Sequence, residues 1–134
     1  MSDTKRILVI DDDADFTESV RSLLEAEGYE VFTAASGTAG LRQLAGVKPH
    51  AILLDVMMES STEGYGVSDA IKHHDEYAAY RDVPVLMVSS IQESPDERFP
   101  RAPETDLIRP DRYFTKPLDI PKFVEVLARV THRR

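Results

Sequence analysis

The sequence contains no cysteine, which excludes a disulfide-stapled scaffold and a zinc site built on thiolates. It also lacks a long hydrophobic run. The longest runs, at residues 51–54 and 85–88, fall far short of the roughly 20 apolar residues that span a bilayer. Residues 1–6 are polar, and no apolar segment of a signal peptide follows them. We therefore expect a soluble, cytoplasmic protein with no membrane partner.

Basic residues are in deficit, with 16 Lys and Arg against 24 Asp and Glu and a formal charge of −8 at pH 7. Because proteins bind nucleic-acid phosphates mainly through Lys and Arg, this balance argues against a nucleic-acid partner. The length of 134 residues predicts one domain, and a hydrophobic content of 42% is enough to build a core. We expect a single acidic domain over residues 1–134.

Short apolar runs alternate with amphipathic stretches along nearly the whole chain, as is typical of β-α units around a parallel sheet. The runs are mostly branched or aromatic, so we interpret them as five strands, at residues 7–10, 30–33, 51–54, 83–88 and 112–114. The first, third and fourth do not alternate between apolar and polar residues. We therefore expect an α/β fold in which helices cover both faces of the sheet.

The stretches between these runs carry helical signals. Apolar residues recur at helical spacing after the first run, at Phe16, Val20, Leu23 and Leu24. Gly28 is the expected stop of that helix. Ser36 is suited to cap a second helix, which we expect to end at Gly46 and Pro49.

Two further helices are expected in the second half of the chain. One is marked by apolar residues between positions 67 and 74. The last starts near Asp119, a suitable N-cap, with Pro121 in its first turn. Its apolar residues are Phe123, Val124, Leu127 and Val130.

Residues 92–111 break this pattern. They hold half of the eight prolines and show no apolar face of helical period. Because an interior proline costs a helix about 3 kcal/mol, we do not expect a regular helix through the whole stretch. We predict an irregular region there.

Chemically active residues stand directly after four of the predicted strands. They are Asp11, Asp12 and Asp13 after the first, Asp55 after the third, Ser89 and Ser90 after the fourth, and Thr115, Lys116 and Pro117 after the fifth. The strands of a parallel sheet all point the same way, so these residues should meet at one edge, where α/β proteins bind ligands.

Crowded carboxylates repel one another, and the repulsion is relieved by protonation or by a cation. Mg²⁺ takes oxygen ligands and keeps several waters, which suits one or two Asp side chains plus a phosphoryl oxygen. Lys116 and the Ser89 hydroxyl would then bind the other phosphoryl oxygens. One carboxylate would be left to act as a nucleophile.

Three runs of the sequence resemble the receiver domain of two-component response regulators. They are ILVIDDD at residues 7–13, ILLDVMM at residues 52–58 and YFTKPL at residues 113–118. The resemblance covers about residues 5–131. It implies a doubly wound, flavodoxin-like parallel sheet of strand order 2-1-3-4-5. It also implies a phosphorelay signalling domain that catalyses only its own phosphorylation and dephosphorylation.

The resemblance further implies the residues of a magnesium site. Asp55 would be the phosphoacceptor. Asp11, Asp12 and Asp55 would bind Mg²⁺ together with the backbone carbonyl of Met57.

It also implies residues that hold the phosphoryl group and signal its presence. Lys116 and Ser89 would contact that group. Tyr113 matches the switch aromatic, whose ring moves inward when Ser89 shifts. A cis peptide bond is expected before Pro117.

Two features depart from the family pattern. Receivers usually carry proline four residues past the phosphoacceptor, where this chain has Glu59, and Gly64 comes one residue late. The stretch between Ser89 and Lys116 is several residues longer than usual, and the surplus lies in residues 92–111. That region normally forms the fourth helix, which is the main signalling face.

Two alternatives stay open on the residues alone. A magnesium-dependent phosphohydrolase of the haloacid dehalogenase type would use Asp11 as nucleophile and Asp13 as its second acid, although Asp15 stands where that motif has threonine. A receiver-like binding module would work without phosphorylation. The favoured reading expects a stand-alone receiver, a monomer or weak homodimer, that takes its phosphoryl group from a sensor histidine kinase or a phosphotransfer protein.

Overall fold

The computed structural model describes residues 4–55, 70–71, 75–80, 83–89, 113–116 and 118–131. Along the chain its elements are β1 (Arg6–Ile10), α1 (Ala14–Ala26), β2 (Glu30–Ala34), α2 (Gly37–Val47), β3 (Ala51–Asp55), the 3₁₀ helix η1 (Asp75–Tyr80), β4 (Val85–Ser89), β5 (Tyr113–Thr115) and α5 (Ile120–Val130). Residues 70 and 71 are also helical, within the third helix that the sequence predicts. The 3₁₀ helix was not predicted.

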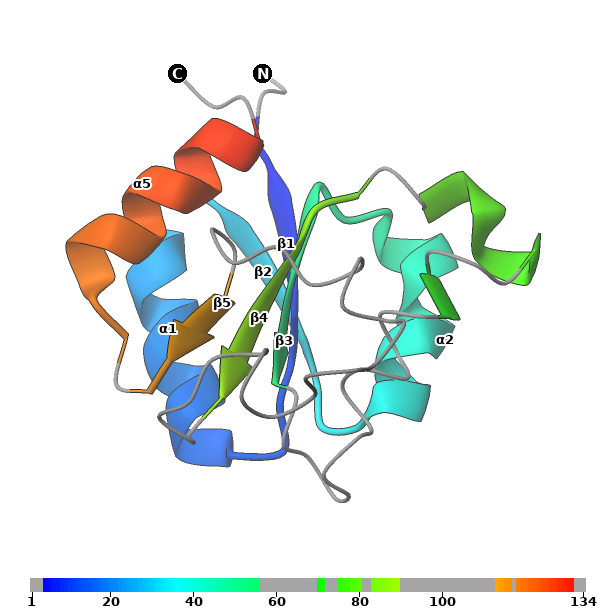
Figure 1. The fold of residues 1–134 in the computed structure, drawn as a ribbon, viewed down its shortest axis with the longest axis horizontal. Helices are drawn as coiled ribbons and strands as arrows, with labels where there is room; N and C mark the ends of the chain where they lie inside the picture. The colour runs from blue at the N-terminus through cyan, green and yellow to red at the C-terminus, as the bar shows by residue number, and fades with distance from the viewer. Residues whose placement is uncertain are drawn as a thin grey trace, which may run out of the picture.

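The five strands form one parallel sheet of order β2-β1-β3-β4-β5, as expected. Helices α1 and α5 lie on one side of the sheet, and α2 and η1 lie on the other (Figure 1). The sheet is therefore doubly wound. The expected fold class is confirmed, while the predicted irregular region at 92–111 lies outside the described residues.

The core consists of two apolar clusters, one on each face of the sheet. Successive strand residues point to opposite faces, so Ile7 and Val9 enter the cluster beneath α1 and α5, while Leu8 and Ile10 enter the cluster beneath α2. All four of these side chains are fully buried. This two-sided burial explains why the central strands are apolar without alternation.

Helix α1 has a defined cap at each end, and the predicted stop at Gly28 is confirmed. The Asp13 side chain accepts a hydrogen bond from the backbone N–H of Phe16, which makes Asp13 the N-cap. Gly28 follows the helix with φ of 96°, a conformation that glycine adopts without strain. Along the helix, Val20 and Leu24 are buried against the sheet.

Helix α2 starts as predicted, with the Ser36 side chain accepting from the backbone N–H of Ala39. Of the two expected stop residues, Gly46 was wrong, because it lies inside the helix, whereas Pro49 directly follows Lys48, the left-handed C-cap with φ of 51°. The cause is tertiary. The Arg6 guanidinium donates hydrogen bonds to the carbonyls of Val47 at 2.7 Å and Lys48 at 2.9 Å. These bonds satisfy carbonyls left open at the helix end and offset the cost of the left-handed residue.

Helix α5 begins as predicted, with Asp119 accepting a hydrogen bond from the backbone N–H of Lys122 and a proline in the first turn. Its buried residues are Phe123, Val126 and Leu127. Val126 was not anticipated, and Val124 and Val130 are only partly buried. The Phe123 ring meets the ring of Phe114 edge to face, at 5.6 Å between centroids, and so joins α5 to β5.

Candidate metal and phosphoryl site

The register of the sheet brings the predicted site residues together. Ile10 of β1 pairs with Leu54 of β3, so Asp11 follows its strand at the level where Asp55 ends β3. Asp55 pairs with Val88, and Ser89 in turn pairs with Thr115. Asp55 and Ser89 therefore stand at the carboxyl ends of their strands, and Asp11 and Lys116 stand one residue beyond the ends of theirs.

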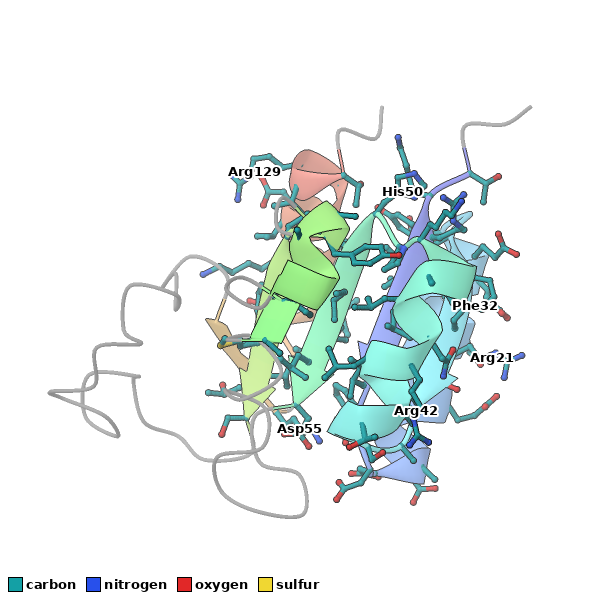
Figure 2. All side chains as sticks on the ribbon, turned by 90° about the vertical axis from the view of Figure 1, so that its right-hand side faces the viewer. Arg21, Phe32, Arg42, His50, Asp55 and Arg129 are labelled. Atoms are coloured by element: carbon teal, nitrogen blue, oxygen red, sulfur yellow. The ribbon has the colours of Figure 1, made fainter. Side chains whose placement is uncertain are left out.

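The carboxylates form a compact acidic cluster at this edge. One side-chain oxygen from each of Asp11, Asp12 and Asp55 lies within 4.8 Å of the others. Asp11 and Asp55 are only 3% and 5% exposed, whereas Asp12 is exposed to solvent. Figure 2 shows Asp55 at one end of β3 and His50 at the other end, and the cluster shares the end that Asp55 occupies.

The ammonium group of Lys116 lies among these acids. Its Nζ atom is 3.0 Å from Oδ2 of Asp11, 3.7 Å from Oδ2 of Asp55 and 4.0 Å from Oδ2 of Asp13. The Lys116 side chain is 17% exposed, so solvent screens these interactions only in part. One cation thus offsets part of the charge of three carboxylates.

Two contacts outside the acidic cluster place Lys116. Its backbone N–H donates to the carbonyl of Ser89 at 2.8 Å, which continues the β4–β5 pairing for one residue beyond the strands. Its Nζ atom lies 4.2 Å from the centroid of the Phe16 ring, in the range of a cation–π contact. The lysine is therefore held both by the sheet and by α1.

The two oxygens of Asp11 differ in their surroundings. Oδ1 accepts a hydrogen bond from the backbone N–H of Asp13 at 2.8 Å. Oδ2 is buried, and its partner among the described residues is the Lys116 ammonium group, with which it forms an ion pair at 3.0 Å. Burial raises the pKa of Asp11 from 3.8 to about 6, with a further upward contribution from Asp55 and opposing contributions from the Asp13 N–H and Lys116.

These observations fit a hard divalent cation. The donors are carboxylate oxygens, and one of them is a buried oxygen without a hydrogen bond. Mg²⁺ selects oxygen donors and keeps part of its water shell, and Asp12 offers an exposed side for that water. Asp11, Asp12 and Asp55 are therefore the described residues that could hold Mg²⁺.

Five of the predicted site residues occupy this edge: Asp11, Asp12, Asp55, Ser89 and Lys116. The backbone of Tyr113 begins β5 and pairs with Met87. Met57 lies outside the described residues, as does Pro117 with its expected cis bond.

Sequence reasoning missed one contributor to the site. The sequence places Phe16 only among the apolar positions of a helix, whereas its ring contacts Lys116. Asp13, which the sequence places among the strand-end acids, is the N-cap of α1, and its Oδ2 atom lies 4.0 Å from Nζ of Lys116. No sequence pattern gives the Phe16 contact, because it depends on the distance between α1 and the end of β5.

Comparison with known families gives one match across nearly the whole chain. The family described as "Response regulator receiver domain" matches residues 7–128. Protein PilG of Pseudomonas aeruginosa is 33% identical over 116 residues, which are 87% of this chain and 79% of PilG. The DNA-binding dual master transcriptional regulator RpaA of a Synechocystis strain is 33% identical over 93% of this chain, but the match spans only 47% of RpaA.

Solved structures agree with this match. The chemotaxis response regulator CheY4 of Vibrio cholerae superposes with a TM-score of 0.75 at 25% identity, covering 95% of this chain and 98% of that chain. A CheY-like response regulator receiver domain protein from Methanospirillum hungatei gives 0.76 at 25% identity, covering 96% and 94%. None of these matches supports a haloacid dehalogenase. In the described part of the chain, no helix has the length and hydropathy of a membrane span.

Proposed function

Because this chain belongs to the response regulator receiver domain family, we propose that Asp55 accepts a phosphoryl group in a Mg²⁺-dependent reaction. The observation that carries the proposal is the position of Asp55, which shares an acidic cluster with Asp11 and Asp12 and lies 3.7 Å from the Lys116 ammonium group. Such a carboxylate has beside it both an acidic cluster that could hold a metal ion and a cation. Phosphoryl transfer depends on this kind of positioning and charge neutralisation.

In the proposed reaction, a carboxylate oxygen of Asp55 attacks the phosphorus of a phosphohistidine in line with the leaving nitrogen. The P–N bond breaks as the O–P bond forms, and the departing imidazole takes a proton. Asp11, Asp12 and Asp55 hold the metal, with the carbonyl of Met57 as a further proposed ligand. Bound Mg²⁺ neutralises charge on the phosphoryl oxygens.

Two other residues act on the phosphoryl group once it is on Asp55. Lys116 leaves part of its carboxylate contact and binds a phosphoryl oxygen, for which its reach to Asp55 is already suited. Ser89 is fully buried at the end of the neighbouring strand, and its hydroxyl donates to a second phosphoryl oxygen. We propose that Ser89 shifts when it binds the phosphoryl group and that Tyr113 responds to this shift as the switch residue. Tyr113 stands two residues before Thr115, the residue of β5 that pairs with Ser89.

The proposed phosphodonor is a sensor histidine kinase or a phosphotransfer protein. We propose that the chain meets this donor in the cytoplasm. The chain itself acts as a signalling receiver, and its chemistry is confined to gaining and losing its own phosphoryl group.

The test is labelling by a small phosphodonor such as phosphoramidate. With Mg²⁺ present, the parent protein should gain one phosphoryl group, measured by intact-mass spectrometry, whereas Asp55→Asn should gain none. Chelation of Mg²⁺ should abolish labelling of the parent. Asp15→Asn is the matched control, because it makes the same change at an exposed acid outside the cluster, and it should label as the parent does.

A different pattern would contradict the assignment. Labelling that survives in Asp55→Asn and is lost in Asp11→Asn would move the nucleophile to Asp11, as a haloacid dehalogenase requires. Labelling of the parent at full rate in the presence of a chelator would remove the metal from the mechanism.

A further inference from the structure

Phe16 belongs to the first turn of helix α1, whereas most residues of the site stand at or near the ends of strands. Its side chain is partly buried and packs against the core cluster beneath α1 and α5. The centroid of its ring is 4.2 Å from Nζ of Lys116. An apolar side chain that packs on the core thus also contacts Lys116, the cation that the described residues place in the acidic cluster.

The backbone of α1 fixes the position of this ring. The N–H of Phe16 donates to Oδ1 of Asp13 at 3.1 Å, and the Thr17 hydroxyl donates to the Asp13 carbonyl at 2.9 Å. The other carboxylate oxygen of Asp13 is 4.0 Å from Nζ of Lys116. The first turn of α1 therefore places both the Phe16 ring and the Asp13 carboxylate beside Lys116. The N-cap hydrogen bond between Asp13 and Phe16 fixes the two residues relative to each other.

An aromatic face offers a cation something that carboxylates do not. It attracts an ammonium group without supplying an oxygen that would bind Mg²⁺ or compete with a phosphoryl oxygen. Lysine has a long flexible stem, so an ammonium group held by Asp11 alone, at 3.0 Å, could still take many positions around that carboxylate. A contact on the ring limits the positions that Nζ can take.

We propose that Phe16 is a positioning residue for Lys116. Its ring face holds the ammonium group where it can pass from Asp11 to a phosphoryl oxygen on Asp55. This role rests on the proposed function, since it concerns the same phosphoryl transfer. The role that we assign to Phe16 is indirect: it acts on the phosphoryl transfer through the lysine.

The experiment compares rates of phosphorylation by phosphoramidate with saturating Mg²⁺. Phe16→Leu keeps an apolar side chain of similar size but has no aromatic face, and it should react roughly threefold to tenfold more slowly than the parent. Phe16→Tyr keeps the ring and should retain most of the rate. Phe32→Leu is the matched control, because Phe32 is a partly buried phenylalanine packed on the opposite face of the sheet, and its rate should equal that of the parent.

Three measurements separate positioning from simple damage to the fold. The Mg²⁺ affinity of Phe16→Leu should be unchanged or tighter, because a loosened lysine competes less with the metal for Asp11, whereas a damaged site would lose rate and affinity together. In NMR spectra, the ring should shift the Cε protons of Lys116 upfield in the parent and in Phe16→Tyr, and Phe16→Leu should lose this shift. In a Lys116→Met background, Phe16→Leu should cause no further loss of rate.

The outcomes distinguish this role from the proposed function. If the parent takes up phosphate and Phe16→Leu does so at the parent rate, the positioning role is overturned while the proposed function stands. The role is equally overturned if Phe16→Leu slows the reaction as much with Met at position 116 as with Lys. A parent protein that takes up no phosphate would contradict the proposed function and the positioning role together.

Discussion

Asp11 illustrates how burial and charge act on a single side chain. Its carboxylate is 3% exposed, and one oxygen has no hydrogen bond among the described residues. Burial favours the neutral acid, and the nearby Asp55 charge acts in the same direction. The ion pair with Lys116 opposes both effects but does not cancel them, so the pKa rises to about 6. A bound divalent cation would favour the ionised form instead.

The raised pKa of Asp11 makes the stability of the metal-free protein depend on pH. The folded protein holds this proton more tightly than the unfolded chain, so the contribution to stability is fully present below pH 3.8 and is lost as pH rises to about 6. Relative to Asp11→Asn, the free energy of unfolding of the parent should fall by on the order of 3 kcal/mol across this window. Urea unfolding in the presence of a chelator would measure it. If the free energy of unfolding of the parent, relative to that of Asp11→Asn, stayed constant or rose between pH 4 and pH 7, the raised pKa of Asp11 would be contradicted.

At the scale of elements, the distance between α2 and the sheet is set by a missing side chain. Gly40 lies over Ile10 of β1, and a Cβ atom built at Gly40 would lie 2.7 Å from Cγ1 of Ile10, with Cδ1 of that side chain also in conflict. Ile10 is fully buried and cannot easily move aside. Because Ile10 immediately precedes Asp11, a change in this packing would also disturb the start of the acidic cluster.

Two glycines of α2 should respond in opposite directions to the same substitution. Gly40→Ala should destabilise the protein by about 1–3 kcal/mol, because the added methyl group overpacks Ile10. Gly46→Ala meets nothing within 4 Å and lies inside the helix, so it should stabilise by about 0.5–1 kcal/mol. Urea unfolding of both variants is the measurement. Equal effects of the two substitutions would show that helix propensity, rather than packing on β1, dominates at both positions.

At the scale of the whole molecule, the proposed metal site exists only in the folded state. Its carboxylates come from the loop after β1 and the end of β3, 44 residues apart along the chain for Asp11 and Asp55, and parallel pairing brings them together. At the opposite edge, two hydrogen bonds join Arg6 and His50: the Arg6 backbone N–H donates to Nδ1 of the His50 side chain, and the His50 backbone N–H donates to the Arg6 carbonyl. Contacts at both ends thus fix the register of β1 against β3.

A ligand that binds only the folded state must raise its stability. Mg²⁺ at a hundredfold excess over its dissociation constant should add about 2.7 kcal/mol, which corresponds to a rise in Tm on the order of 10 °C. Asp12→Ala should show little of this rise, because it removes one carboxylate of the cluster. Asp15→Ala removes the same charge from an exposed acid of α1 outside the cluster and should keep the full rise, as measured by calorimetry. An equal rise in both variants would exclude Asp12 as a ligand.

The sequence alone determined the fold class, because its signals are local. Apolar runs such as residues 51–54 fix the strands by their composition, and Asp13, Ser36 and Asp119 mark helix starts through bonds to N–H groups within three residues. The strand order and the predicted roles of Asp55 and Lys116 came instead from resemblance to a family. Local pattern could state only that such residues gather at one edge of a parallel sheet.

Only the tertiary structure decided contacts that join distant parts of the chain. The end of α2 at a left-handed Lys48 depends on Arg6, which is more than 40 residues away in sequence. The ion pair between Asp11 and Lys116 and the ring of Phe16 against Lys116 likewise depend on how closely α1 packs beside β5 and the end of β1. The physical reason is common to all of them: burial and through-space charge depend on distances set by packing, and no short segment of sequence encodes those distances.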